Sequence, residues 1–213
     1  MLNVKFFNKY LFGTKMICTD IFFSNLEALN QNKLINLYKK IMLPLLLIAL
    51  AIIVLGYYLK NDYSIVRDII VNKPKQEVFE YIKLLRNQNE YSYYNRKDPL
   101  TVKSYTGTDG EVGFTYTWSS TINSIGSGTQ TITKIVDGQS LFCDIEFSKP
   151  VPLSSKAEIT VTEIAANQTK VTWTFSSHYK FPLNVIIYFV NLEKLIGTDI
   201  TSSLVTLKEK LES

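Results

Sequence analysis

The longest apolar segment of the chain runs from Ile41 to Leu59 and reads IMLPLLLIALAIIVLGYYL. It contains no charged residue, and the hydroxyls of Tyr57 and Tyr58 are its only polar side-chain groups. A helix of this length extends about 28 Å, close to the thickness of the hydrocarbon core of a bilayer. The segment is apolar on every side, unlike the one-sided stripe of a surface helix. This pattern predicts a transmembrane helix.

A cleaved signal peptide and a buried core helix are the two other interpretations of this segment. It is longer than the usual apolar region of a signal peptide, and it ends in Gly-Tyr-Tyr-Leu-Lys rather than in a small-residue cleavage motif. Pro44 falls in the first turn of the predicted helix, where a missing N–H costs little. Tyr57 and Tyr58 lie at the far end, as aromatic residues do at membrane interfaces. These features favour an uncleaved membrane anchor.

Beyond residue 60 the apolar residues alternate with polar ones in short runs, which is typical of β-strands. Residues 63–71 form the first such run. Pro74 then predicts the first position of a helix, because its fixed φ suits that position. A polar, tyrosine-rich loop follows over residues 87–99. The predicted helix before this loop has an apolar stripe at a spacing of three to four residues, formed by Val78, Phe79, Ile82 and Leu85.

Turn signals and alternating runs fill the middle of the chain. Six of the nine glycines fall between Gly107 and Gly138. Asp-Gly at 109–110, Gly-Ser-Gly at 126–128 and Asp-Gly at 137–138 are typical of hairpin turns. The runs around them each have one apolar and one polar face, so we predict an antiparallel sheet covered on one side. These runs are residues 112–118, 141–147, 156–162 and 170–175.

A long amphipathic helix is predicted to cover that sheet. From Asn184 to Leu211, just past Pro182, apolar residues recur at steps of three and four. Gly197 lies in the middle, where glycine costs up to about 1 kcal/mol relative to alanine, so we expect a close approach of the backbone to the sheet or to a ligand. The predicted fold class is α+β, a curved antiparallel sheet of about seven strands around a long C-terminal helix, preceded by one transmembrane helix. The stripe consists of Val185, Phe189, Leu192, Ile196, Ile200, Leu204, Leu207 and Leu211.

Charge divides the chain into a tail (residues 1–40), the apolar segment (residues 41–59) and a domain (residues 60–213). The tail has six cations and two acidic residues and so carries the whole net charge of +4, whereas the domain has seventeen of each. Nucleic-acid-binding domains carry a basic face, so no nucleic-acid partner is expected. The lysines and arginines within fifteen residues of the two ends of the segment are equal in number. Lys39 and Lys40 directly before it still favour a single-pass protein of a bacterial inner membrane, with a cytoplasmic tail and an exported domain.

The end of the tail, residues 26–40, has a loosely helical pattern. It fits an amphipathic helix at the membrane surface, a weakly ordered tail, or an upstream extension of a protein that starts at Met42. Cys18 and Cys143 lie on opposite sides of the apolar segment, so a membrane-spanning segment would prevent them from pairing within one chain. His178 is the only histidine, which excludes histidine-rich metal sites and two-histidine catalysis.

Several motifs between residues 63 and 212 resemble, in their order and spacing, those of the START/Bet v1-like superfamily. The resemblance is to the bacterial polyketide cyclase/dehydrase-like (SRPBCC) proteins, which often carry an N-terminal apolar helix before the first strand. Relatives usually have a tryptophan pattern such as WSPW after the first helix, whereas this chain has Tyr91-Ser92-Tyr93-Tyr94. The matching stretches are Ile69–Asn72 with Pro74 and Val78-Phe79, Asp98-Pro99, Tyr105–Trp118, Gly126–Thr133, Phe147 with Pro150, Thr169–Trp173, Phe181-Pro182, Ile196-Gly197 and Leu207-Lys208.

The resemblance implies a helix-grip fold with a cavity between sheet and helix, which holds a hydrophobic small molecule or a lipid. Gly197 and the aromatic residues of the apolar strand faces are the expected lining; the alternative is that the rings simply fill the core. Tyr91, Tyr93 and Tyr94 are expected to gate the cavity, to contact lipid headgroups, or to form an exposed turn. The aromatic lining residues are Tyr116, Trp118, Phe147, Trp173 and Phe175.

No catalytic residue, metal site or cofactor is predicted. Asp144, Glu146 and Glu158 share the polar faces of their strands, and no Ser/His/Asp set, phosphate loop or metal-ligand spacing occurs. The preferred function is a membrane-anchored binding module for a hydrophobic small molecule or lipid, with exchange through a gap between the long helix and the Tyr91–Tyr94 loop. One alternative is an enzyme of the cyclase or hydrolase type that uses His178 or a tyrosine. The other is a protein-interaction domain of an envelope assembly, with an unknown partner.

Overall fold

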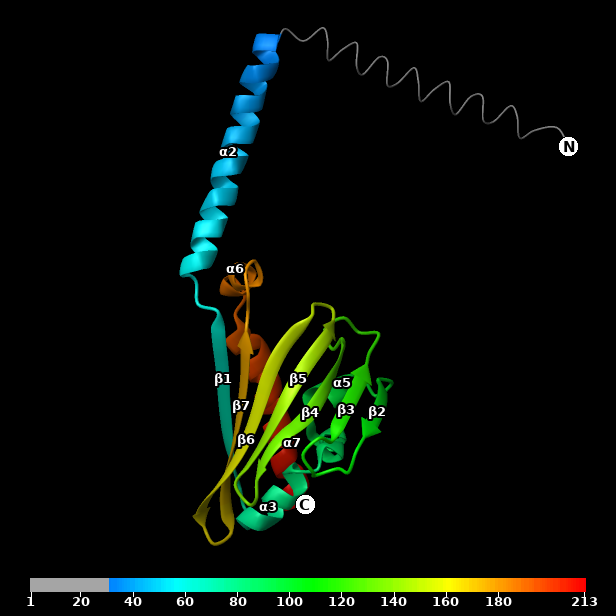
Figure 1. Ribbon diagram of the computed structural model, residues 1–213. Helices are drawn as coiled ribbons and strands as arrows, with labels where there is room; N and C mark the ends of the chain where they lie inside the picture. The colour runs from blue at the N-terminus through cyan, green and yellow to red at the C-terminus, as the bar shows by residue number, and fades with distance from the viewer. Residues whose placement is uncertain (1–30) are drawn as a thin grey trace, which may run out of the picture. The chain divides into compact units, whose positions relative to one another are not determined.

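The computed structural model describes residues 31–213 (Figure 1), with side chains described from residue 35 onward. Residues 1–30 lie outside this range, and with them most of the predicted tail. The chain divides into two compact units, residues 1–55 and 56–213. Most of helix α2 belongs to the first unit, and the sheet with its covering helices belongs to the second.

Helix α2 (Gln31–Tyr58) contains the predicted apolar segment. It begins well before Ile41, so the prediction that the helix starts with the apolar run was wrong. Lysine and leucine have high helix propensity, and these residues extend the helix upstream. Pro44 therefore lies inside the helix, where the carbonyl of Lys40 lacks its usual partner. Residues Ile35–Tyr58 are long and apolar enough, by length and composition, to cross a membrane, and an 18-residue window within them has a mean hydropathy of 2.5.

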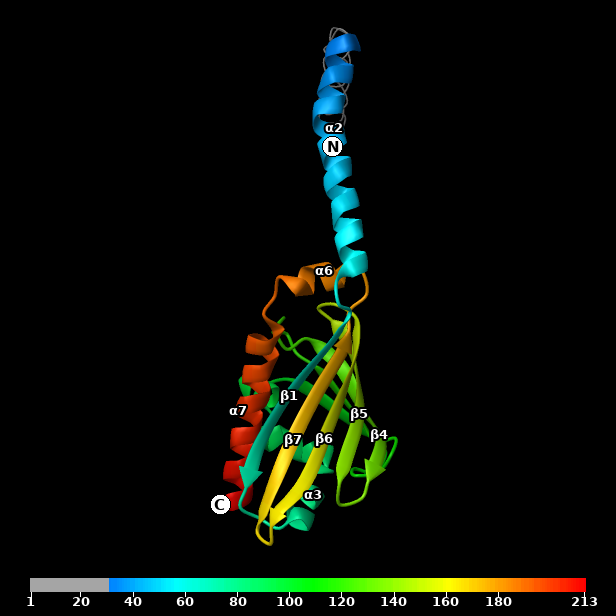
Figure 2. The same cartoon turned by 90° about the vertical axis from the view of Figure 1, so that its left-hand side faces the viewer.

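Seven antiparallel strands form one curved sheet in the order β1-β7-β6-β5-β4-β3-β2 (Figures 1 and 2). This confirms the predicted α+β helix-grip class. The first strand pairs with the last, from Asp62 opposite His178 to Val71 opposite Thr169. The strands are β1 (Asp62–Val71), β2 (Val102–Thr106), β3 (Thr115–Ser119), β4 (Ser127–Val136), β5 (Ser140–Lys149), β6 (Leu153–Ala165) and β7 (Gln168–His178).

Two strand boundaries differ from the sequence prediction. The run over residues 112–118 is a strand only from Thr115 onward, because Gly113 has a φ of 94° and interrupts the extended backbone. In the predicted turn at 126–128, only Gly126 has a positive φ, and β4 already begins at Ser127. Both differences arise where glycine takes a conformation that other residues rarely adopt.

Helix α7 (Leu192–Glu212) runs along the inner side of the sheet (Figure 2). The single helix predicted from Asn184 to Leu211 was wrong, because α6 (Leu183–Tyr188) and α7 are separate. The side chain of Asn191 accepts a hydrogen bond of 2.9 Å from the backbone N–H of Lys194 and so caps α7. The other helices are α3 (Lys75–Ile82), the 3-10 helix η1 (Leu85–Asn87), α4 (Gln88–Tyr91) and α5 (Tyr93–Lys97).

The core lies between the sheet and the helices. Residues of one parity on each strand point inward, as the alternating runs predict: Val71 on β1 and Val171 on β7 are fully buried and lie in neighbouring strands. Val78 and Phe79 of α3 and Leu204 of α7 cover them from the other side. This core occupies one end of the space under the sheet, and the other end contains the candidate site.

The buried side chain of Asn184 holds the last turn of α2 against the start of α6. It is 1 % exposed. Its Nδ2 donates to the carbonyl of Gly56 at 2.6 Å and to Oδ1 of Asn61 at 2.9 Å. The carbonyls of a helix's last turn lack intrahelical partners, so Asn184 satisfies a group that would otherwise be buried unpaired.

Replacing Asn184 with alanine is expected to lower the free energy of unfolding by about 2 kcal/mol, because the Gly56 carbonyl loses its donor while it stays buried. Urea unfolding of the full chain in detergent micelles measures this. The matched control is Asn167→Ala in the exposed β6–β7 turn, which should change little. Equal stability of the two variants would contradict the structural role of Asn184.

Candidate functional site

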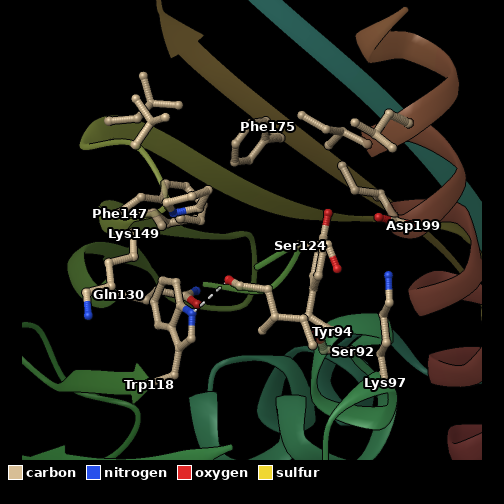
Figure 3. Close-up of a pocket in the computed structure, with 18 of the residues that line it drawn as sticks. Ser92, Tyr94, Lys97, Trp118, Ser124, Gln130, Phe147, Lys149, Phe175 and Asp199 are labelled. Carbon is tan, nitrogen blue, oxygen red and sulfur yellow. Dashed lines mark hydrogen bonds between the residues drawn. The ribbon is translucent and has the colours of Figure 1, made fainter. Parts of the chain in front are cut away.

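A cavity of about 560 Å³ lies between the inner face of the sheet and α7. Figure 3 shows Trp118 and Phe147 across this space from Tyr94 and Asp199, with Phe175 on a third side. The strand residues expected at the cavity all line it: Tyr116 and Trp118 of β3, Phe147 of β5, and Trp173 and Phe175 of β7. They surround an open space, so they do not merely fill the core. Their contact with a ligand stays a prediction.

Tyr116, Trp118 and Phe147 form a continuous row of rings along one wall. Tyr116 and Trp118 stack with centroids 5.7 Å apart, and Trp118 meets Phe147 edge to face at 5.6 Å. The hydroxyl of Tyr116 donates to Oδ1 of Asn95 at 2.9 Å, and Nε1 of Trp118 donates to the carbonyl of Ile125 at 3.4 Å. Because the polar atoms of these rings have partners in the protein, the wall presents mainly apolar ring surface to the cavity.

Helix α5 is fixed to α7 by hydrogen bonds, and it brings polar residues to the cavity. The backbone N–H of Tyr93 donates to Oγ of Ser203 at 2.9 Å. Nη2 of Arg96 donates to Oγ of Ser202 at 3.1 Å. These bonds close the gap between α7 and the tyrosine loop at that point.

The three tyrosines expected to gate the cavity have different positions. Tyr91 is fully buried, with its ring edge to face with Trp173 at 6.3 Å, so it belongs to the core. Tyr93 lies under the ammonium of Lys97 and is not part of the lining. Only Tyr94 lines the cavity. A gate made of all three side chains does not fit this arrangement, because α4 turns Tyr91 inward.

The polar end of the cavity was not predicted from the sequence. Asp199 of α7, Tyr94 of α5 and Lys97 line it together (Figure 3). Burial, followed by the nearby charge of Asp199, raises the pKa of Tyr94, so its phenol stays neutral. Within residues 31–213 the Asp199 carboxylate forms no salt bridge. Asp199 lies between Ile196 and Ile200 in the sequence, but a single acidic residue at such a position gives no sequence signal of a cavity.

Gly197 lies outside the cavity, against Arg67 of β1. A Cβ at this position would overlap Nη2 of Arg67. The guanidinium also forms an ion pair of 2.7 Å with Glu193. Gly197 therefore lets α7 approach a side chain of the sheet, as one of its two predicted roles requires, and it is not among the residues that line the cavity. Arg67 has the same parity as Ile65 and Ile69, and this pattern could have placed it on the inner face.

Asp98 holds the loop that follows α5 and leads to Thr101, another residue of the cavity wall. Its carboxylate accepts bonds from Oγ of Ser120 at 2.5 Å and from the N–H of Leu100 at 3.0 Å. The bond from Ser120 is the largest of the effects that lower the pKa of Asp98. Folding therefore favours the ionised form of this carboxyl group.

The stabilisation from Asp98 is expected to be lost in acid. Because its folded pKa lies below the unfolded value of about 3.9, the contribution is present above that value and disappears as the pH falls through the folded pKa. Asp98→Asn should be less stable than the wild type at pH 7, and the difference should shrink toward pH 2. Urea unfolding at a series of pH values measures this. A difference that is the same at every pH would show that the charge of Asp98 contributes nothing.

His178 and the acidic residues considered for catalysis lie away from the cavity, whereas Tyr94, Tyr116 and Tyr179 line it. His178 is exposed at the end of β7, and its Nδ1 lies 2.8 Å from Oδ1 of Asp62. Glu146 accepts a hydrogen bond from Ser154 on the outer face of the sheet. Neither residue lines the cavity, and nor do Asp144 and Glu158.

The arrangement of elements is similar to that of several solved structures. A protein from Nitrosospira multiformis is 16% identical, with 71% of this chain and 97% of that chain covered and a TM-score of 0.51. A Rhizobium loti protein is 13% identical, with 70% and 96% covered and a TM-score of 0.53. Truncated norcoclaurine synthase from Thalictrum flavum is 13% identical, with 70% and 92% covered and a TM-score of 0.54.

Identities this low establish the fold alone, which is the helix-grip arrangement of a curved antiparallel sheet around a C-terminal helix. No family model matches the chain, and no curated protein matches it.

Proposed function

We propose that residues 60–213 form a binding module for an amphipathic molecule with a large apolar part, and that α2 anchors this module in a membrane. The cavity of about 560 Å³ with its wall of aromatic rings is the observation that carries the proposal. Ligand sites in proteins are mostly apolar spaces of about 300–1,000 Å³ with a few polar groups that fix orientation. Bet v1-like folds commonly bind hydrophobic ligands in such a space.

The polar end of the cavity supports an amphipathic ligand over a plain hydrocarbon. Asp199 presents a carboxylate and Tyr94 a neutral phenol beside the otherwise apolar wall. A ligand with a hydroxyl or amine at one end would pair with Asp199, while its apolar part lies against Trp118 and Phe147. Asp199 forms no salt bridge within residues 31–213, so its carboxylate is available for a charge-assisted hydrogen bond to such a group.

The anchor is proposed from the length and hydropathy of residues Ile35–Tyr58. With Lys39 and Lys40 on the preceding side, the positive-inside rule favours a cytoplasmic N-terminus and an exported domain. Protease digestion of right-side-out and inverted membrane vesicles tests this orientation. Protection of the domain in right-side-out vesicles would reverse it.

The binding proposal is tested with the full chain, purified in detergent and transferred to phospholipid nanodiscs. Solvent extraction and mass spectrometry should recover an amphipathic molecule in stoichiometric amount, beyond the nanodisc lipid. Fluorescence of added cis-parinaric acid should rise and saturate, in excess over empty nanodiscs. The absence of both a recovered molecule and saturable fluorescence would refute the proposal.

A further inference from the structure

The rim of the cavity consists of the residues that line it and are also exposed to solvent. They come from three places: the α6–α7 segment, the β5–β6 turn and the β3–β4 loop, with Lys97 of α5 beside them. Four of these residues are apolar, and the exposure of their side chains to water is unfavourable. The four are Pro150, Val151, Ile186 and Leu195.

An exposed apolar patch continues from this rim over α6 and the last residues of α2. Phe189 directly follows α6 and is 75% exposed, and Tyr57 and Tyr58 are 84% and 80% exposed. All three belong to the second unit of the chain. A contiguous patch of this kind marks an interaction surface. The α6 patch, as we call it, consists of Tyr57, Tyr58, Phe181, Ile186, Tyr188, Phe189 and Val190.

The charges around the α6 patch are cations. Lys60, Lys180 and Lys194 are exposed next to it in the chain, and Lys97 and Lys149 are exposed on the rim. In the described part of the chain, none of the five forms a salt bridge. Of the acidic neighbours, Glu193 forms an ion pair with Arg67, and Asp62 lies 2.8 Å from Nδ1 of His178. Tyrosines and other apolar side chains ringed by lysines are the composition that binds anionic bilayer surfaces.

The covalent chain also restricts what can cover the α6 patch. Tyr57 and Tyr58 are part of the patch and are also the last residues of the apolar helix α2. If that helix spans a bilayer, these two tyrosines lie at the bilayer surface. Asn184 bonds the Gly56 carbonyl, so the start of α6 lies next to the same turn. A lipid surface is therefore within reach of the patch without any partner protein.

We propose that the α6 patch and the apolar rim insert into the interface of an anionic bilayer, so that the ligand passes directly between bilayer and cavity. This inference rests on the proposed function, since it needs both the anchor and the binding cavity. It places the exchange route at α6. The bonds from Tyr93 to Ser203 and from Arg96 to Ser202 join α5 to α7 and so oppose the expected route between them.

Spin labels on the full chain in phosphatidylcholine–phosphatidylglycerol vesicles test the insertion. Cys18 is replaced by serine, while Cys143 is buried and burial raises the pKa of its thiol to about 12, so it does not react. One label is placed by Phe189→Cys. The control, Ile164→Cys, is at the exposed far end of β6. At position 189 oxygen should relax the label more than a water-soluble nickel chelate does, and at position 164 the reverse should hold.

Two outcomes would overturn the inference. One is a label at position 189 that is as accessible to the nickel chelate as the label at position 164. The other is spin–spin broadening at position 189 that disappears on dilution with unlabelled protein, because a second copy then covers the patch. Either result would leave ligand binding intact. A wild-type protein without saturable cis-parinaric acid binding would instead refute the proposed function.

Transfer kinetics test the exchange route. In the double variant Tyr188→Ser, Phe189→Ser, movement of cis-parinaric acid from vesicles into the protein should slow at least about tenfold, because the patch inserts less deeply. Equilibrium affinity should stay the same, since neither side chain lines the cavity. Val66→Ser, which removes an exposed apolar side chain from β1, is the control. Unchanged transfer in the double variant would refute the route.

Discussion

Replacing both Leu153 and Ile196 with tryptophan is expected to lower the affinity for cis-parinaric acid at least about a hundredfold, or by about 3 kcal/mol. Leu153 lines the cavity from β6 and Ile196 lines it from α7. Two indole rings from facing walls would occupy the space that the apolar part of the ligand needs. Fluorescence titration of the full chain in nanodiscs measures the affinity.

The control for this variant is Val205→Trp, which adds an indole to α7 at an exposed position outside the cavity. It should bind like the wild type. Because larger side chains fit into an existing space, the double variant should lose no more than about 1–3 kcal/mol of stability. A folded double variant with wild-type affinity would show that the probe binds elsewhere, and the α6 patch would be the next place to examine.

The sequence predicted the wall of this site better than its polar end. Strand alternation assigned Tyr116, Trp118 and Phe147 to the apolar face, because period-two patterning fixes the face of a residue once its strand is known. Strand alternation could not identify Asp199, because this residue lies on helix α7. A single acidic residue on an amphipathic helix is usually solvated, and only the position of α5 shows that it faces a cavity.

The two errors in the helical regions have different physical causes. Apolar periodicity continues through Phe189 although the helix does not, because Asn191 caps a new helix and periodicity carries no information about caps. Tyr91 was expected at the surface because it lies in a polar loop. The short helix α4 instead turns it against Trp173. A local cap decided the first case and packing of α4 against β7 decided the second, and apolar periodicity contains neither.

The approach of Gly197 to the sheet was foreseen, but the contact with Arg67 was not. A mid-helix glycine indicates that something lies close by, and the alternatives were the sheet and a ligand. Arg67 lies among apolar residues of the same parity on β1. This position indicates that its side chain points to the inner face of the sheet. Reading the two residues together would have selected the sheet. The side-chain register of β1 and α7 is needed to see that they meet.

Replacing Gly126 with alanine is expected to lower the free energy of unfolding by about 3 kcal/mol, the largest stability effect we predict for a single methyl group. Gly126 has a φ of 65°, which costs a residue with a Cβ about 1–2 kcal/mol. The added Cβ would also overlap the backbone carbonyl of Lys149 and lie 3.1 Å from Cδ of Pro150. Backbone atoms cannot rotate away as a side chain does, so the strain adds to the cost of the conformation.

Gly113→Ala separates these two contributions. Gly113 has a φ of 94°, but a Cβ there meets no atom within 4 Å, so only the conformational cost of about 1–2 kcal/mol applies. Chemical unfolding of both variants in detergent micelles should therefore show the larger loss for Gly126→Ala. Ile125, Lys149 and Pro150 all line the cavity, so the overlap would also push the β5–β6 turn outward. Equal losses of unfolding free energy in the two variants would show that the overlap with Lys149 and Pro150 is relieved at no energetic cost. The β3–β4 loop would then be able to move enough to widen the cavity mouth.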